Sequence, residues 1–133
     1  MSQKTILITD DEPHMRRLVQ FNLGRLGHRI ELAASGDEAL AKAEQINVDL
    51  LVIDVVMAGL DGFATVRELR KDPRHGSLPV IMLTSRGLAD TREKAADLGV
   101  NVFLTKPFSP IELTRHATEL LGGGNANAVT TTP

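Results

Sequence analysis

Polar side chains that could take part in chemistry follow four of the apolar runs in this sequence. Each stands at the position where the run ends, and together they are Asp10, Asp11, Asp54, Thr84 and Lys106. Taken singly, each has an ordinary explanation, because acids and hydroxyls in such places often cap helices and a lone lysine is commonly a surface residue. Their shared position at the ends of apolar runs is what indicates chemistry.

A cluster of these side chains would be electrostatically demanding. Two carboxylates about 5 Å apart repel by roughly 3 kcal/mol at an effective dielectric near 20, so three of them need raised pKa values or a cation. An oxygen-only donor set favours a hard cation such as Mg²⁺. Metal, ammonium and hydroxyl around one carboxylate are what phosphoryl transfer requires, with an aspartate as nucleophile giving an acyl phosphate. The sequence therefore predicts a phosphorylation site.

Five short apolar runs supply the strands that must position this site. They lie at residues 6–8, 30–33, 50–53, 80–83 and 102–104. Three of the runs are continuous rather than alternating, which is typical of strands buried on both faces of a parallel sheet. Glu31 interrupts the second run, so we place that strand nearer an edge. Because the carboxyl ends of parallel strands meet at one edge, the polar residues should converge there.

Segments of helical periodicity alternate with these runs. The first predicted helix contains Met15–Leu26 and stops at Gly27, and the second starts at the capping box Ser35/Glu38. The third covers residues 63–70 and stops at Asp72-Pro73, and the fourth covers residues 88–98 and ends at Gly99. The fifth starts at the N-cap Ser109, with Pro110 at its first position. Strict alternation predicts an α/β fold of (βα)₅ type, a doubly wound parallel sheet with helices on both faces. We assign residues 1–121 to this domain and residues 122–133 to a flexible Gly/Asn/Thr-rich tail or the start of a linker.

Composition narrows the partners. The 133 residues include no cysteine, tryptophan or tyrosine, and the net charge is −2. These features exclude disulfides and give no electrostatic or stacking case for nucleic-acid binding, so we expect no direct nucleic-acid contact. No signal peptide or membrane-length apolar run is present in the sequence, and we expect a cytoplasmic protein without membrane contact.

The ordered markers of this sequence resemble the receiver domains of two-component signalling, the CheY-like superfamily. The markers are Asp10-Asp11, Asp54, Met57, Asp61-Gly62, Thr84 and Lys106-Pro107, and the resemblance covers residues 4 to about 121. It implies a flavodoxin-like sheet of five strands in the order 2-1-3-4-5. It also implies a signalling domain rather than an enzyme acting on an external substrate.

The resemblance assigns roles to the site residues. Asp54 would accept a phosphoryl group from a sensor histidine kinase or a histidine phosphotransfer protein. Mg²⁺ would be held by Asp10, Asp11, Asp54 and the main-chain carbonyl of Val56; Lys106 would pair with the phosphate and Thr84 would hydrogen-bond it. Phe103 matches the aromatic switch residue, although an ordinary core role is equally consistent with its type. The output would reach a downstream protein through the fourth helix, fifth strand and fifth helix, from a monomer or a phosphorylation-dependent dimer.

Three positions near the site, Ala58, Val56 and Arg86, bear on how closely the sequence follows the family pattern. Ala58 stands where the family often has proline, which would loosen a loop without altering chemistry. Val56 is apolar, and Arg86 lies two residues beyond Thr84. These last two positions tune phosphate lifetime in the family, and the apolar Val56 leads us to expect slow self-dephosphorylation.

Other functions fit the sequence less well. A pseudo-receiver that binds partners without phosphorylation should have lost an acid, Thr84 or Lys106, and none is lost. A haloacid-dehalogenase-type phosphatase needs a second acid two residues after its nucleophile, where Val56 stands. A dinucleotide-binding domain needs a Gly-x-Gly-x-x-Gly segment after the first strand, and none follows here. The histidines at 14, 28, 75 and 116 are interpreted as surface or capping residues.

Overall fold

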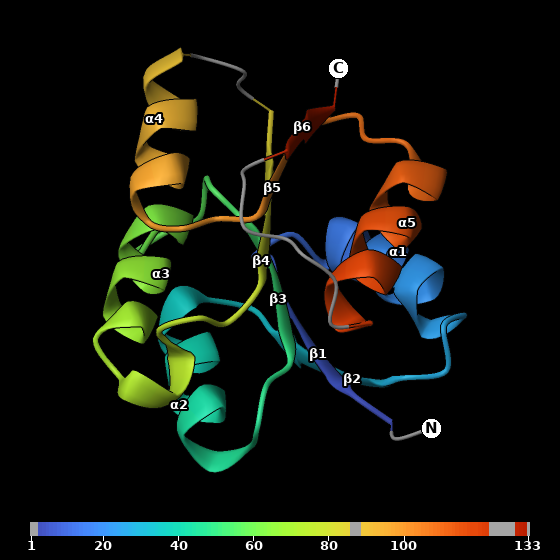
Figure 1. Cartoon of the computed structure of the whole chain (residues 1–133), viewed down its shortest axis with the longest axis horizontal. Helices are drawn as coiled ribbons and strands as arrows, with labels where there is room; N and C mark the ends of the chain where they lie inside the picture. Colours follow the sequence, from blue (N-terminus) through green and yellow to red (C-terminus); the bar gives the residue numbers. More distant parts are fainter. Residues whose placement is uncertain (1–2, 86–88, 123–129, 133) are drawn as a thin grey trace.

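A computed structural model describes residues 3–85, 89–122 and 130–132 of the chain, and its strands and helices alternate along the sequence (Figure 1). The strands are β1 (Thr5–Thr9), β2 (Arg29–Ala33), β3 (Leu50–Asp54), β4 (Val80–Thr84), β5 (Val102–Thr105) and β6 (Thr130–Thr132). The helices are α1 (Pro13–Gly24), α2 (Gly36–Gln45), α3 (Gly62–Arg70), α4 (Ala89–Asp97) and α5 (Pro110–Leu121), with a short 3₁₀ helix η1 (Pro73–His75). None of the helices in this described part is long and apolar enough to cross a lipid bilayer.

The strands form one parallel sheet in the order β2-β1-β3-β4-β5-β6. The predicted order 2-1-3-4-5 is confirmed, and β2, the strand that contains Glu31, lies at an edge as expected. The sheet also has a sixth strand that the sequence analysis did not predict: β6 pairs in parallel with β5, with Thr131 opposite Phe103. The division into a domain of residues 1–121 and a tail stays a prediction, since residues 123–129 and 133 lie outside the described residues.

Helices cover both faces of the sheet, which explains why the central strands are continuously apolar. In Figure 1, α1 and α5 lie on one side of the strands and α2, α3 and α4 on the other. Alternate side chains of β1 illustrate the consequence: Ile6 and Ile8 belong to the core under α1 and α5, whereas Leu7 belongs to the core under α2 and α3. Each face of the sheet is thus buried, as the parallel strand pattern predicts.

The helix starts follow the predicted caps. The side chain of Ser35 accepts a hydrogen bond from the Glu38 main-chain N–H, and Ser109 accepts one in the same way from Glu112. The first helix begins at Pro13, two residues before the predicted Met15, because proline fits the first helical position without losing a hydrogen bond. The fourth helix begins at Ala89, and residue 88 of the prediction lies outside the described residues.

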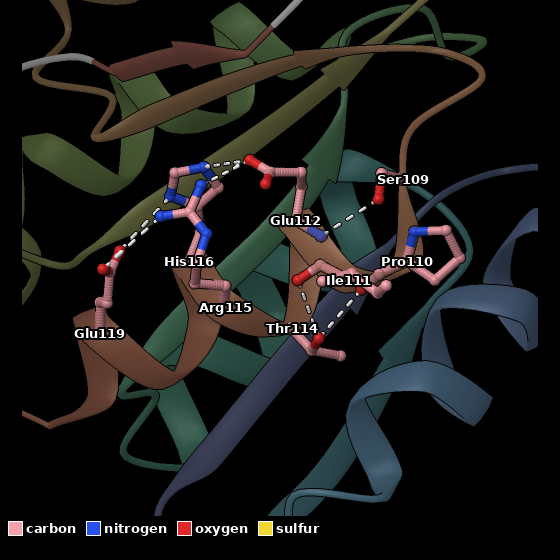
Figure 2. A network of polar contacts seen from close by, with 8 residues as sticks. All are labelled: Ser109, Pro110, Ile111, Glu112, Thr114, Arg115, His116 and Glu119. Carbon is pink, nitrogen blue, oxygen red and sulfur yellow. Dashed lines mark hydrogen bonds and ion pairs between the residues drawn. The ribbon is translucent and has the colours of Figure 1, made fainter.

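Two of the four histidines, which were expected to be surface or capping residues, are buried. His75 is 5% exposed and His116 is 3% exposed. The His116 ring lies between the carboxylates of Glu112 and Glu119, 3.7 Å from each, while Arg115 binds the same two acids (Figure 2). Burial lowers the pKa of His116, with the Arg115 charge acting in the same direction. Sequence spacing could not show this burial, because it depends on the tertiary packing around each ring.

Gly36 sets how closely α2 approaches α3, and this contact gives a stability prediction. A side-chain methyl group at residue 36 would collide with Thr65 Oγ1 and lie 2.9 Å from the main-chain oxygen of Leu60. We expect Gly36→Ala to lower the free energy of unfolding by about 1–3 kcal/mol, measured by urea denaturation. Gly24→Ala is the matched control, because that helical position has open space, and it should gain about 0.5–1 kcal/mol. Equal stabilities of the two variants would contradict the close contact.

Candidate functional site

The carboxyl ends of four neighbouring strands bring the predicted polar residues to one edge of the sheet. β1 and β3 are paired in register with Thr9 opposite Ile53, so Asp10 and Asp54 follow the same register position. β4 and β5 pair with Thr84 opposite Thr105, which places Lys106 immediately beyond that pair. Parallel pairing therefore assembles residues that lie up to 96 positions apart, as the sequence analysis expected.

Three carboxylates form the centre of this site. One oxygen from each of Asp10, Asp11 and Asp54 lies within 4.8 Å of the others. Asp10 and Asp54 are buried, at 2% and 7% exposure, whereas Asp11 is exposed. Asp10 Oδ1 accepts a hydrogen bond of 2.9 Å from the Glu12 main-chain N–H, but Asp10 Oδ2 is buried without a hydrogen-bond partner. Among the described residues, this buried oxygen therefore has an ion pair with Lys106, at 3.6 Å, but no hydrogen bond.

Lys106 provides the positive charge within the cluster. Its Nζ lies 3.1 Å from Asp54 Oδ2 and 3.6 Å from Asp10 Oδ2, and its side chain is 18% exposed. The main-chain N–H of Lys106 donates to Thr84 O at 2.6 Å, and the Lys106–Pro107 peptide bond is cis. The hydrogen bond joins the end of β5 to the end of β4, and the ammonium group lies beside the carboxylates of Asp10 and Asp54.

Burial dominates the electrostatics of Asp10. Desolvation raises the pKa of its carboxyl above the ordinary value of 3.8, and the charges of Asp54 and Asp11 add to that increase. The hydrogen bond from Glu12 N–H and the attraction to Lys106 oppose it without cancelling it. Ionisation of Asp10 therefore costs more free energy in the folded protein than in water, and a bound cation would lower that cost.

The loop after β3 contributes contacts that the sequence analysis did not identify. The Ala58 main-chain N–H donates to Asp11 Oδ2 at 3.0 Å, which fixes the exposed carboxylate. Gly62 packs against the chain at Asp54: a methyl group there would collide with Asp54 O and lie 2.9 Å from Val55 Cα. The marker Asp61-Gly62 was the only available signal, and its role becomes evident from this close approach of α3 to β3.

The two predicted switch residues are both fully buried, with Thr84 and Phe103 at 0% exposure. Phe103 belongs to the core on the side of α2, α3 and α4, so the ordinary core role is real in this structure. Val56, by contrast, has a side chain that is 53% exposed. Arg86, the other residue expected to influence phosphate lifetime, lies outside the described residues.

The donor set fits Mg²⁺. All candidate side-chain ligands are carboxylate oxygens, and among the described residues the buried Asp10 Oδ2 accepts no hydrogen bond, so it can serve as a metal ligand. Magnesium prefers oxygen ligands and usually binds one or two carboxylates while keeping positions for water and phosphate oxygens. The participation of the Val56 carbonyl stays a prediction.

Comparisons with known proteins agree with this geometry. The family model of the response regulator receiver domain matches residues 6–118. Chemotaxis protein CheY4 of Vibrio cholerae superposes with a TM-score of 0.85 at 31% identity, covering 90% of this chain and 100% of CheY4. The receiver domain of the sensor histidine kinase PA1611 from Pseudomonas aeruginosa PAO1 superposes with a TM-score of 0.82 at 32% identity over 91% of this chain and 99% of that domain. That neighbouring structure contains a magnesium ion coordinated in its active-site cleft.

Sequence relatives correct one expectation about partners. RpaA of Synechocystis, named a DNA-binding dual master transcriptional regulator, is 36% identical over 116 residues, which make up 87% of this chain and 48% of RpaA. Other relatives are also named transcriptional regulators, and the chain spans about half the length of the curated relatives it matches. The expectation of no nucleic-acid contact is therefore wrong as a statement about proteins of this kind. The charge and aromatic content of this chain describe the part that it shares with these relatives, and carry no information about the remaining half of their length.

The raised pKa of Asp10 predicts an unusual effect of a charge-removing substitution. Without Mg²⁺, Asp10→Asn should raise the free energy of unfolding at neutral pH by on the order of 1 kcal/mol, because it removes a buried charge that the fold disfavours. The gain should disappear as the pH falls through the raised pKa, since the folded wild-type protein then binds a proton at Asp10. Urea denaturation across pH measures both effects.

The control for this prediction is Asp37→Asn, an exposed acid in the first turn of α2. Mg²⁺ should raise the free energy of unfolding of the wild-type protein and of the control by the same amount at a given ion concentration, and should raise that of Asp10→Asn much less. A loss of stability in Asp10→Asn at neutral pH without metal would contradict the desolvation argument.

Proposed function

Because the chain belongs to the response regulator receiver family, we propose that Asp54 is its phosphoacceptor and that phosphorylation, with Mg²⁺ bound, switches its surface. The observation that supports this most strongly is the position of the Asp54 carboxylate: its Oδ2 lies 3.1 Å from Lys106 Nζ, and one of its oxygens lies within 4.8 Å of oxygens of two further carboxylates. The protein is then a signalling domain that is itself modified, rather than an enzyme that turns over an external substrate.

The residues present supply the functions that phosphoryl transfer needs. An oxygen of Asp54 attacks phosphorus, and the donor's leaving group departs on the opposite side. Lys106, already paired with Asp54, would neutralise the phosphoryl oxygens, and Thr84 would donate a hydrogen bond to one of them. Bound Mg²⁺ supplies charge neutralisation between the phosphoryl group and the carboxylates. Asp10 and Asp11 would hold the ion with Asp54 and the Val56 carbonyl, and the magnesium in the similar PA1611 receiver supports this assignment.

The phosphodonor we propose is a sensor histidine kinase or a histidine phosphotransfer protein. Such a donor must bring a histidine close to Asp54, and an apolar surface is available on two adjacent helices. Phe21 and Leu18 on α1 are 69% and 46% exposed, and Ile111 at the start of α5 is 77% exposed. Figure 1 shows α1 and α5 side by side. α1 begins at Pro13, shortly after Asp10 and Asp11.

Phosphorylation would be transmitted through Thr84 and Phe103 to the face formed by α4, β5 and α5. Thr84 is the last residue of β4, and Phe103 of β5 lies opposite Met82 of β4. A phosphate held by Thr84 and Lys106 would draw the ends of β4 and β5 towards Asp54. Such a signal biases an existing equilibrium, so a partner must bind one of the two states better than the other.

Intact mass measurement tests the proposal directly. Incubation with a small acyl phosphate and Mg²⁺ should add one phosphoryl group, and omission of Mg²⁺ should abolish the addition. Asp54→Asn should remain unmodified because the nucleophile is absent, while the exposed-acid control Asp37→Asn should be modified like the wild-type protein. Modification of Asp54→Asn to the wild-type extent would show that another residue accepts the group.

Absence of an adduct has two readings that a second measurement separates. Rapid hydrolysis would hide the acyl phosphate, but a beryllofluoride mimic would still bind with Mg²⁺. If the mimic also failed to bind, the protein would be a pseudo-receiver that works through protein contacts alone.

Val56 generates a prediction about the lifetime of the phosphorylated state. Its apolar, half-exposed side chain cannot hydrogen-bond an attacking water, so phosphate loss should be slow. We expect Val56→Asn and Val56→Glu to change the loss rate severalfold, towards faster hydrolysis, as a polar group there can orient water. Decay of the phosphorylated mass after removal of the donor measures the rate. Ile111→Asn controls for an exposed apolar-to-polar change elsewhere, and an unchanged rate in both Val56 variants would refute the hypothesis.

A further inference from the structure

Arg70, the last residue of α3, binds four main-chain carbonyls from two other parts of the fold. Its Nε donates to Leu98 O at 2.9 Å and its Nη2 to Gly99 O at 3.1 Å. Its Nη1 donates to His75 O at 2.9 Å and to Leu78 O at 2.7 Å. The planar guanidinium has its five N–H groups in a fixed arrangement, so these bonds hold the four carbonyls in one geometry.

Two of these carbonyls belong to the C-terminal end of α4. The helix ends in a Schellman motif, with Val100 N–H donating to Ala95 O, Gly99 N–H to Ala96 O and Gly99 at a φ of +73°. The motif leaves the Leu98 and Gly99 carbonyls to find other donors, and Arg70 supplies them. A cation also complements the negative end of the helix dipole. Arg70 thus caps a helix other than its own.

The same end of α4 is tied to the sheet. Asn101 N–H donates to Val80 O at 3.0 Å, and Val80 N–H donates to the Asn101 side-chain oxygen at 2.9 Å. The starts of β4 and β5 are therefore locked together directly after the helix. Arg70 adds α3 and the segment before β4 to this joint.

The described residues of α4 before this end have fewer polar contacts. Among the described residues, those at 91–94 form no hydrogen bond or ion pair with another element, and Lys94, in the last turn, makes one cation–π contact with Phe63 at 5.8 Å. Within residues 91–97, the buried side chains are Thr91 and Ala95. Figure 1 shows the C-terminal end of α4 nearer to α3 than its N-terminal end. The helix is thus firmly held at one end.

The other end of α4 is the one that follows the functional site. β4 ends at Thr84, beside the Lys106 N–H, and the chain then leads to the start of α4 at Ala89. Any movement of Thr84 reaches the helix at its N-terminal end. A helix of this length spans about 13 Å, so a small rotation about its far end displaces the near end by ångströms.

We propose that Arg70 is a positioning residue that makes the C-terminal end of α4 a fixed pivot, so that phosphorylation moves the N-terminal end of the helix. This inference rests on the proposed phosphorylation of Asp54 and specifies how that signal reaches the surface. Arg70 touches no reacting atom and acts only through the carbonyls of residues 98 and 99.

Distances between spin labels test the pivot, since the natural chain has no cysteine. Labels are placed through Asp37→Cys on α2 paired with Arg92→Cys or with Asp97→Cys, all at exposed positions. On addition of beryllofluoride and Mg²⁺, the 37–92 distance should change and the 37–97 distance should stay nearly constant. In an Arg70→Gln background both distances should change, because the pivot is gone. Arg67→Gln, an exposed arginine on the same helix, should behave as the wild-type background.

Several outcomes would overturn the pivot. Equal changes of the two distances in the wild-type background would do so, as would a constant 37–97 distance in Arg70→Gln. Arg70→Lys serves if Arg70→Gln fails to fold, because it keeps the charge but cannot bind four carbonyls.

A measurement without ligand separates this inference from the proposed function. Amide exchange at Leu98 and Val100 should accelerate about tenfold or more in Arg70→Gln and not in Arg67→Gln. Unchanged exchange would refute the anchor whether or not Asp54 is phosphorylated. A wild-type protein that binds no beryllofluoride and gains no phosphoryl group, yet shows the exchange effect, would refute the proposed function and leave the anchor standing.

Discussion

Mutual repulsion among three carboxylates is the constraint on which the rest of this structure depends. Asp10, Asp11 and Asp54 lie within 4.8 Å of one another, and two of them are buried. Left alone, such a cluster opposes folding; burial raises the pKa of Asp10, and the charges of Asp54 and Asp11 raise it further. Lys106 offsets only part of it, from a position next to Asp54 and Asp10. The remaining deficit of positive charge is what makes the site suited to a divalent cation.

A rigid sheet is needed to hold these charges together. The central strands are buried on both faces, so their ends cannot separate without exposing core side chains on both sides. Gly62 brings α3 against the chain at Asp54, and the Ala58 N–H fixes Asp11. These contacts hold the three acids close to one another.

Around this rigid centre the helices differ in how firmly they are held. α5 packs on the sheet through Leu113, Ala117, Leu120 and Leu121, while its N-cap and the ion pairs along one face stabilise the helix itself. Within residues 91–97 of α4 the buried side chains are Thr91 and Ala95, and the C-terminal end of the helix is anchored through Arg70 and the Schellman motif. A helix anchored at this end is suited to convert a small displacement at Thr84 into a change of surface.

The sequence by itself determined the alternation of strands and helices, the edge position of β2, the caps at Ser35 and Ser109, and the convergence of Asp10, Asp54, Thr84 and Lys106. All of these follow from local periodicity and from the rule that parallel strands end at one edge. Tertiary structure alone decided the burial of His75 and His116, the pairing of β6 with β5, the close approach at Gly62 and the capping of α4 by Arg70. These features depend on which distant backbone atoms meet, and no spacing along the chain encodes that meeting.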